Sequence, residues 1–309
     1  IIGSTCGDRM EATGASELHG GGGNDTLVAR GDIDLFGGDD NDLFGLNPNN
    51  SGRLGQAIYD GGAGNDRATI SVGGVEDFTD NTFVSIESLS ISNFNGFGSF
   101  SFTASQIDGF STITLRNGGS GDLELGVVMG DQTTLDLSDR VVFGIADDRF
   151  VITGDTDAET ITGSRLDDVI NGGGGDDILK GAAGDDWLTG GTGADQLDGG
   201  DGIDTADYSA SAGRINVNLT TGVGLGGDAH GDTLTGIENL IGTDSSATDF
   251  LTGNSIANTI NGGAGDDVIA GLGGADTLIG GSGNDTADYS ASAARVSINL
   301  ASGSGLGGD

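Results

Sequence analysis

A nine-residue repeat is the feature that most constrains how this chain folds. Residues 172–180 read GGGGDDILK, and the next three nonapeptides are GAAGDDWLT, GGTGADQLD and GGDGIDTAD. The shared pattern is Gly-Gly-x-Gly-x-Asp-x-U-x, in which U is a large apolar residue. The phase extends backward, so consecutive repeats cover 154–207, and a second array covers 244–288. A noisier set near the N-terminus includes 20–28, 37–45 and 61–69.

Each nonapeptide predicts a turn followed by a very short strand. The GGxGxD half needs turn conformations that glycine adopts at low cost. The x-U-x half forms a strand with U pointing inward, and such a short strand is stable only when turns stack. Two nonapeptides make one coil of about 18 residues, and successive coils lie about 4.8 Å apart. The sequence therefore predicts an all-β parallel solenoid whose core holds the U residues, among them Ile170, Leu179, Leu188, Leu197, Ile269 and Leu278.

A longer period is superimposed on the nonapeptides. TADYSASA occurs at 205–212 and again 81 residues later at 286–293. Between the arrays, Ile215, Val217 and Leu219 alternate with polar residues, which indicates a half-buried strand. Residues 70–153 contain β-type runs without the nine-residue phase, so we expect an additional β-rich insert there. Its segment FVSIESLSIS (83–92) resembles LTGIENLIGT (234–243), and no segment of the chain predicts a helix.

These patterns divide the chain into six predicted parts. They are a degenerate N-terminal roll (1–69), the β-rich insert (70–153), a repeat array (154–207), spacer strands (208–243), a second array (244–288) and the start of a further spacer (289–309). Because the chain begins at Ile1 and stops within a repeat, we expect it to be a segment of a longer protein.

Composition restricts the partners. The formal net charge is −37, and only 11 residues are Lys or Arg. Nucleic acid and anionic membranes both need basic patches, so neither is an expected partner. The single Cys6 allows no internal disulfide, and no apolar run is long enough to predict a membrane span. Of the 48 acidic residues 7 are Glu, which leaves 41 Asp, and short carboxylates beside tight turns are suited to gripping hard cations.

Stacking explains why a cation is expected. Two carboxylates about 4–5 Å apart repel by roughly 3–4 kcal/mol at an effective dielectric constant near 20. A divalent cation between them reverses the sign of that interaction. The glycine turns leave backbone carbonyls to complete an all-oxygen shell of about six ligands. Oxygen ligands without His or Cys favour Ca²⁺ over Zn²⁺, so several bound calcium ions are predicted.

The repeat resembles the RTX (repeats-in-toxin, or hemolysin-type) family. The resemblance is strong over 154–207 and 244–288, partial over 1–69 and weak over 70–153. It implies a right-handed parallel β-roll, folding triggered by calcium, and export by a type I secretion system. The TADYSAS and GIENL spacers are similar to those of long, surface-associated, S-layer-type RTX proteins.

The family pattern also implies which residues hold the metal. In the two arrays the sixth-position acids are Asp168, Asp177, Asp186, Asp195, Asp204, Asp249, Asp267, Asp276 and Asp285, and N-terminal candidates are Asp25, Asp34, Asp42 and Asp66. Expected neighbours are Asp168 with Asp186, Asp186 with Asp204, and Asp177 with Asp195. The resemblance implies loop carbonyls as further ligands, such as those of Gly172, Gly174, Gly181, Gly190, Gly199, Gly262, Gly271 and Gly280.

Three departures from the pattern predict weak or empty sites. Glu159 and Asn258 stand where the sixth-position Asp belongs, and the repeat 163–171 lacks three of the glycines present in 172–180. The fifth-position acids are expected to be solvated, and Trp187 is expected on the outer face.

No catalytic motif accompanies the repeats. His-Glu-x-x-His, Gly-x-Ser-x-Gly and a phosphate loop ending in Gly-Lys-Ser/Thr are all missing from the sequence, so we predict no enzyme activity. The first hypothesis is an extracellular, calcium-rigidified module of a surface layer, adhesin or filament, whose partners include other copies of itself or cell-surface glycans. The alternative is the non-catalytic RTX region of a secreted protease, lipase or mannuronan epimerase.

Overall fold

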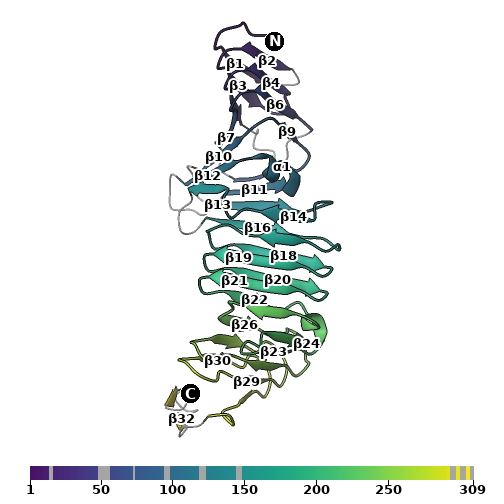
Figure 1. The fold of residues 1–309 in the computed structure, drawn as a ribbon, viewed down its shortest axis with the longest axis vertical. Coiled ribbons are helices and arrows are strands. Elements are labelled where there is room, and N and C mark those ends of the chain that lie inside the picture. The colour runs from purple at the N-terminus through teal and green to yellow at the C-terminus, as the bar shows by residue number, and fades with distance from the viewer. Residues whose placement is uncertain are drawn as a thin grey trace. The chain divides into compact units, whose positions relative to one another are not determined.

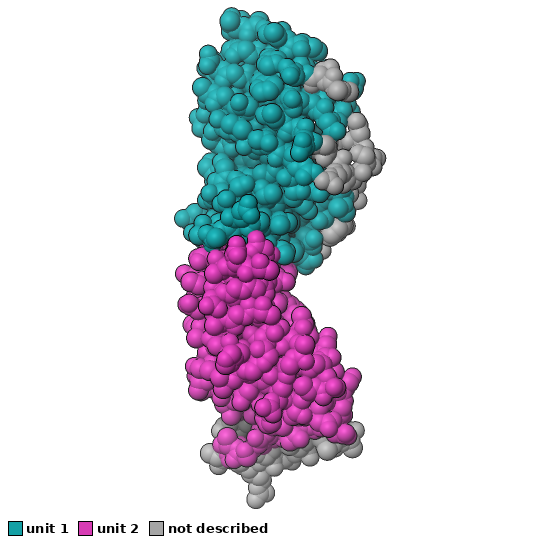
Figure 2. Space-filling view, turned by 90° about the vertical axis from the view of Figure 1, so that its right-hand side faces the viewer, with its two compact units in different colours: residues 1–153, 164–168 teal, residues 154–163, 169–309 magenta. Residues whose placement is uncertain are grey.

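The computed structural model describes residues 1–13, 17–47, 56–71, 74–93, 98–117, 123–143, 148–292, 297–299 and 304–306. The chain forms two compact units, coloured separately in Figure 2. The first unit holds residues 1–153 with 164–168, and the second holds 154–163 with 169–309. Each unit is a parallel β-solenoid, and the two are described separately below. No helix within the described ranges is long and apolar enough to cross a membrane.

The first unit is built from parallel sheets on the faces of its coils (Figure 1). Strands that are neighbours in a sheet come from successive coils, which is why their numbers alternate. One seven-stranded sheet runs β1 (Arg9–Thr13), β3 (Thr26–Arg30), β5 (Leu43–Leu46), β7 (Arg67–Ser71), β10 (Ser88–Asn93), β12 (Thr112–Asn117) and β15 (Val141–Phe143). A four-stranded sheet runs β2 (Leu18–Gly22), β4 (Leu35–Asp39), β6 (Ile58–Ala63) and β9 (Thr82–Val84). Further strands of the unit are β8 (Gly74–Asp77), β11 (Gly98–Thr103), β13 (Leu123–Val128), β16 (Arg149–Thr153) and β14 (Thr134–Asp136).

The second unit repeats this plan with the clean nonapeptides. One face runs β18 (Val169–Gly174), β20 (Trp187–Thr192), β22 (Thr205–Asp207), β26 (Asn239–Ile241), β28 (Thr259–Asn261) and β30 (Thr277–Ile279). The other runs β17 (Thr160–Thr162), β19 (Ile178–Ala183), β21 (Gln196–Asp201), β25 (Thr233–Thr235), β24 (Val223–Leu225), β23 (Asn216–Asn218), β27 (Phe250–Thr252), β29 (Val268–Ala270) and β31 (Thr286–Ala287). Within the first array the register is eighteen residues, as in Ile178↔Gln196, which is two nonapeptides.

The spacer inserts an antiparallel hairpin into this second face. Strands β23 and β24 pair antiparallel, β24 pairs antiparallel with β25, and β23 pairs parallel with β27. The sheet therefore resumes its parallel order after the hairpin. Strands β32 (Ser297–Asn299) and β33 (Ser304–Leu306) form the same antiparallel pair 81 residues later, with Ser297 opposite Leu306 as Asn216 is opposite Leu225. The 81-residue period is thus a structural period as well.

The core is a column of U side chains, as the repeat predicts. Ile170, Leu179, Leu188, Leu197 and Ile269 are buried. Leu278 is half-buried, and Trp187 lies on the outer face with 39 % of its surface exposed.

The predicted β-rich insert adds a cluster of aromatic rings to buried aliphatic side chains such as Leu89. The rings of Phe78 and Phe102 stack with centroids 5.1 Å apart, and Phe83 and Phe110 pack edge-on against each other at 5.5 Å.

The prediction that no helix forms was wrong. Within the described residues, helix α1 (Ala104–Gly109) begins after Thr103, whose hydroxyl accepts the N–H of Gln106 while the Gln106 side chain accepts the N–H of Thr103. This capping box is written in the sequence as Thr-x-x-Gln. A short 3₁₀ helix, η1 (Gly227–Ala229), lies in the spacer.

Truncating a core rung tests the solenoid packing. We expect Leu188→Ala to lower the free energy of unfolding in calcium by about 2–5 kcal/mol, because it leaves a cavity in a fully buried column. Leu225→Ala removes the same atoms from a side chain that is 51 % exposed, and should cost less than about 1 kcal/mol. Urea denaturation followed by circular dichroism measures both, and equal losses would contradict the assigned core.

Candidate calcium sites

The sixth-position acids form hydrogen-bonded columns, here called acid ladders. In the first unit the backbone N–H of Asp25 donates to Oδ1 of Asp42 at 2.7 Å, and that of Asp42 donates to Oδ1 of Asp66 at 2.7 Å. The N–H of Asp8 begins the ladder by donating to Asp25, and the N–H of Asp66 donates to Oε2 of Glu87. Each carboxylate is therefore held in place by the main chain of the preceding coil.

The second unit carries two acid ladders, one for each edge of its coils. On one edge the N–H of Asp177 donates to Oδ1 of Asp195 at 2.9 Å, and Asp195 donates in the same way to Asp232. On the other edge the N–H of Asp186 donates to Oδ1 of Asp204 at 2.8 Å. After the spacer the same bonds join further pairs, namely Asp249 with Asp267, Asp267 with Asp285, and Asn258 with Asp276.

The second carboxylate oxygen of most ladder acids has no hydrogen-bond donor. Among the described residues, buried Oδ2 atoms without a partner belong to Asp25, Asp42, Asp66, Asp177, Asp195, Asp204 and Asp267. A buried and unpartnered anionic oxygen costs several kcal/mol unless a cation or donor satisfies it. These atoms therefore mark places where the fold needs a positive charge.

A backbone carbonyl faces the open oxygens of Asp25, Asp42, Asp66, Asp177, Asp204 and Asp267. A Cβ built on Gly172 would lie under 3.0 Å from both Oδ2 of Asp177 and the carbonyl oxygen of Gly190. Gly181 stands in the same relation to Asp186 and the carbonyl of Gly199. The first glycine of the repeat thus leaves room for a cradle of oxygens that any side chain would fill. The predicted carbonyl ligands that face such a cradle are those of Gly172, Gly190, Gly199, Gly262, Gly271 and Gly280.

The second glycine of the repeat controls whether Oδ2 stays available. Gly173 and Gly191 have φ values of +97° and +98°, a left-handed conformation that favours glycine. Where that residue is not glycine and φ is not positive, its N–H turns onto the acid. The N–H of Ser164 donates to Oδ2 of Asp168 at 2.6 Å. In the second array the N–H of Thr243, which directly precedes the repeat 244–252, donates to Oδ2 of Asp249 at 2.8 Å.

This difference divides the predicted sites into two classes. Loops with a left-handed second residue leave an anionic oxygen facing a carbonyl, whereas the loops of Asp168 and Asp249 satisfy that oxygen locally. Asn258 belongs to the second class, because its Oδ1 accepts the N–H of Asn254 at 2.9 Å. Glu159 keeps its Oε2 beside the carbonyl of Gly172, so a glutamate there still faces a cradle.

Burial of the ladders changes their proton affinity. Burial raises the pKa of Asp195 to about 7, and the nearby charges of Asp232 and Asp177 raise it further, while the N–H bond from Asp177 opposes the rise. Burial likewise raises the pKa of Asp42 and of Asp204 to about 6. It raises the pKa of Glu159 to about 7, with the charge of Asp177 adding to the effect. A cation bound at these positions would favour the ionised form and reverse the shift.

A family comparison agrees with this geometry. The model of the RTX calcium-binding nonapeptide repeat matches four segments, residues 12–36, 153–186, 172–206 and 252–287. The chain carries RTX calcium-binding nonapeptide repeats. No curated protein shows a significant match to the chain. The RTX assignment implies Ca²⁺ as the ligand of the acid ladders, and the oxygen cradles of carboxylate and carbonyl fit a hard, oxygen-seeking cation.

The structure places the remaining predicted site residues as follows. Asp34 lies half-buried on the opposite edge from Asp25, and its Oδ1 accepts the N–H of Ile58 at 2.8 Å. Asp276 is half-buried and Asp285 is exposed near the end of the second array. Asp168 belongs to the first unit and Asp186 to the second. In the described part of the chain no three His, Cys, Asp or Glu side chains cluster, so backbone carbonyls must supply much of any RTX metal shell.

Ladder members outside the nonapeptides were missed by the sequence analysis. Asp148 is buried and its Oδ1 accepts the N–H of Leu123, and Asp232 accepts that of Asp195. Glu87 and Glu238 accept the N–H groups of Asp66 and Asp204. In the sequence each of these acids stands one or two residues before a short apolar strand but lacks the glycine pattern of a nonapeptide. That position was the signal that could have identified them as ladder members.

Asp232 differs from the other RTX ladder acids in its second oxygen. The hydroxyl of Tyr208, a buried residue of the TADYSAS spacer, donates to Oδ2 of Asp232 at 2.8 Å. A tyrosine hydroxyl thus supplies the donor that a nonapeptide site leaves to a cation. Burial and the charge of Asp232 raise the pKa of Tyr208 well above its usual value, so the hydroxyl keeps its proton.

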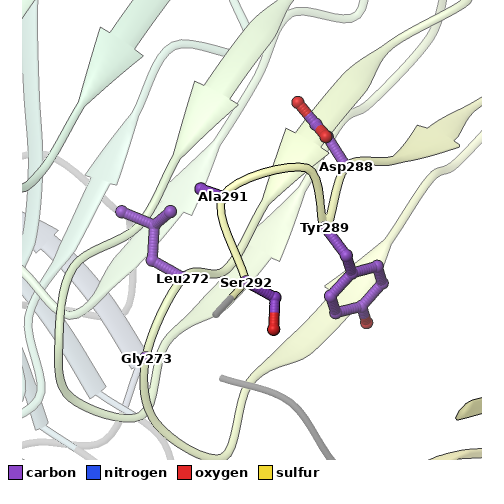
Figure 3. Close-up of a pocket in the computed structure, with 6 residues that line it drawn as sticks. All are labelled: Leu272, Gly273, Asp288, Tyr289, Ala291 and Ser292. Carbon is purple, nitrogen blue, oxygen red and sulfur yellow. The ribbon is translucent and has the colours of Figure 1, made fainter. Parts of the chain in front are cut away.

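The second TADYSAS segment lines a small pocket (Figure 3). Its lining includes Leu272, Gly273, Asp288 and Tyr289, and Tyr289 holds the position of Tyr208 in the 81-residue period. Hydrogen bonds from Ser290 hold the pKa of Asp288 below its usual value. Among the lining residues that the structure describes, Asp288 is the single carboxylate.

Fifth-position acids are exposed, as predicted, and they also connect coils. Oδ1 of Asp176 accepts the N–H of Ala194, and Oδ1 of Asp185 accepts that of Ile203. These bonds need an acceptor but no charge.

Adjacent acids in one RTX loop provide a matched test. We expect Asp177→Asn to reduce the number of calcium ions bound per chain by at least one, because it removes the buried anionic oxygen. Asp176→Asn makes the same change of charge next to it, but it keeps the acceptor for Ala194 and should leave the number unchanged. Equilibrium dialysis against calcium gives both numbers. Equal losses in the two variants would contradict the ladder assignment.

The raised pKa values predict how pH affects the calcium-free fold. The unfolded carboxyls titrate near 3.8, whereas the folded ones titrate near 6 to 7. Between these values the folded state holds the extra protons, so the stabilisation they provide is lost as pH rises. We expect protonation to replace calcium in part, so the β signal of chelator-treated protein in circular dichroism should be present near pH 4 and be lost as pH rises to 7. A β signal that grows over this range would contradict the burial of the ladder acids.

Proposed function

We propose that this chain is a calcium-folded structural module of a secreted or surface-displayed protein. The observation that supports it best is the set of buried carboxylate oxygens without a donor, most of them opposite a main-chain carbonyl. A formal charge of −37 opposes compaction unless cations neutralise part of it. Calcium would supply that neutralisation inside the fold, and the RTX repeats are its expected ligands.

The proposed calcium ligands follow the two classes of loop. Strong sites are proposed at Asp25, Asp42, Asp66, Asp177, Asp186, Asp195, Asp204 and Asp267 with the facing carbonyls. Weaker sites are proposed at Asp34, Asp168, Asp249, Asp276 and Asp285, where Oδ2 is satisfied locally or the acid is less buried. The six-part division of the chain is likewise proposed as its functional organisation.

Calcium dependence would couple folding to location. Extracellular calcium modules bind with dissociation constants of about 10⁻⁴–10⁻³ M. At 100 times the dissociation constant, each site adds about 2.7 kcal/mol to the free energy of unfolding. Where calcium is scarce the repulsion of the ladders would keep the chain open and suitable for export, and at millimolar calcium it would fold. RTX repeat proteins are typically secreted, which supports this reading.

The tandem architecture supports a structural rather than a catalytic role. The antiparallel hairpin recurs at an interval of 81 residues, which is typical of a chain that extends by repetition. We therefore propose a surface layer, adhesin or filament, with other copies of the chain or cell-surface glycans as partners. The alternative is the RTX region of a secreted protease, lipase or mannuronan epimerase. The full-length gene discriminates, because the alternative requires a catalytic domain elsewhere in it.

Calcium removal tests the proposal directly. We expect the chain to be expanded, with a coil spectrum, in a chelator, and compact with a β spectrum in millimolar calcium. Magnesium should not replace calcium, because it demands near-ideal octahedral geometry and loses its water reluctantly. Size-exclusion chromatography and circular dichroism report the two properties. A chain that stays compact after complete metal removal would overturn the proposal.

A further inference from the structure

Two tripeptides outside the nonapeptides stand at corresponding places on acid ladders of different units. In the first unit Ser85-Ile86-Glu87 lies one coil after Asp66 on the acid ladder. In the second unit Gly236-Ile237-Glu238 lies one coil after Asp204. Neither segment lies within a matched RTX repeat. Their central isoleucines are both buried, with 4 % and 3 % of their surface exposed.

The hydrogen bonds of the two tripeptides are the same. The N–H of Asp66 donates to Oε2 of Glu87 at 2.7 Å, and the N–H of Asp204 donates to Oε2 of Glu238 at 3.0 Å. In return the N–H groups of Glu87 and Glu238 each donate to the carbonyl of the preceding acid at 3.1 Å. A glutamate therefore takes the place that Oδ1 of an aspartate has in an ordinary rung.

The first residue of each tripeptide turns its carbonyl toward the ladder. Ser85 and Gly236 both have left-handed backbones, with φ of +50° and +60°. A Cβ built on Gly61 would lie under 3.0 Å from the Ser85 carbonyl and from Oδ2 of Asp66. A Cβ built on Gly199 would meet the Gly236 carbonyl and Oδ2 of Asp204 in the same way.

This is the cradle of an ordinary site with one component replaced. In the arrays the carbonyl belongs to the first glycine of the repeat eighteen residues later. The carbonyl of Gly199, for example, faces the cradle at Gly181. Here it comes from Ser85 or Gly236, which belong to no nonapeptide. Asp66 and Asp204 are 1 % and 0 % exposed, and their Oδ2 atoms have no hydrogen-bond partner among the described residues.

We propose that each tripeptide supplies the missing half of the calcium site at the last repeat of its ladder, with the Ser85 carbonyl facing Oδ2 of Asp66 and the Gly236 carbonyl facing Oδ2 of Asp204. The proposal rests on the calcium-binding function proposed above and extends it to residues that the nonapeptide pattern does not include. Glu87 and Glu238 are positioning residues, since they hold the main chain of the aspartate through its N–H. The motif [Ser/Gly]-Ile-Glu is then a terminal rung that lets the aspartate of the last repeat bind calcium without a following repeat.

The carboxylate half of the site is tested by two variants in one loop of the full chain. Asp204→Asn removes the buried anionic oxygen and should reduce the calcium bound per chain by at least one ion in equilibrium dialysis. Asp201→Asn changes the charge of an exposed residue of the same loop and should bind as many ions as the unaltered chain.

The carbonyl half is tested by substitutions that differ in their tolerance of positive φ. Gly236→Val disfavours the left-handed backbone and should remove that ion or weaken its binding at least tenfold. Gly236→Ser reproduces the residue found at Ser85 and should keep the full number of ions. Circular dichroism in calcium verifies that each variant is folded, and Ser85→Val with Ser85→Gly repeats the comparison in the first unit.

The outcomes separate this inference from the proposed function. Folded Gly236→Val and Ser85→Val chains that bind as much calcium as the unaltered chain would overturn the terminal rungs while leaving the nonapeptide sites intact. Loss of an ion in Ser85→Gly would also overturn them, because glycine adopts the same positive φ without adding atoms. An unaltered chain that binds no calcium at all would instead refute the proposed function.

Discussion

The backbone N–H of one ladder acid donating to the carboxylate of the next coil is the interaction on which the rest of the structure depends. It fixes one oxygen of each carboxylate and the spacing of the coils together. In most ladder acids it also leaves the second oxygen buried without a donor. Register and burial therefore arise from the same bond, and the proposed calcium ions would bind where that second oxygen stays open.

Glycine serves two different purposes in this arrangement. The first glycine of the loop leaves the space that the oxygens occupy, and the second adopts positive φ so that its N–H turns away from the acid. Ser164 and Thr243 show the alternative, in which a local N–H satisfies the carboxylate. A single backbone angle thus distinguishes an aspartate whose second oxygen is left without a donor from one whose second oxygen accepts a local N–H.

The spacers show how a ladder is interrupted without breaking the solenoid. Tyr208 donates a hydrogen bond to Oδ2 of Asp232, the oxygen that most nonapeptide acids leave without a donor. The antiparallel hairpin β23–β24 follows, and β23 pairs parallel with β27, so the sheet resumes its original strand direction. On the other edge Oε2 of Glu238 accepts the N–H of Asp204 and so extends that acid ladder by one coil. On one edge the spacer thus supplies its own donor, whereas on the opposite edge Oδ2 of Asp204 still has none among the described residues.

The nonapeptide period determined the parallel solenoid, the inward U residues and the outward Trp187, because a nine-residue phase allows one register of stacked coils. Composition alone indicated a hard cation. The tertiary structure decided which aspartates keep an open oxygen, since that depends on the φ of a neighbouring residue and on carbonyls eighteen or more residues away. It also brought Glu87, Glu238, Asp148 and Asp232 into the ladders, which spacing along the chain does not reveal. Helix α1 was local and could have been found from its Thr-x-x-Gln cap, whereas the phenylalanine packing of the insert exists only once its coils are stacked.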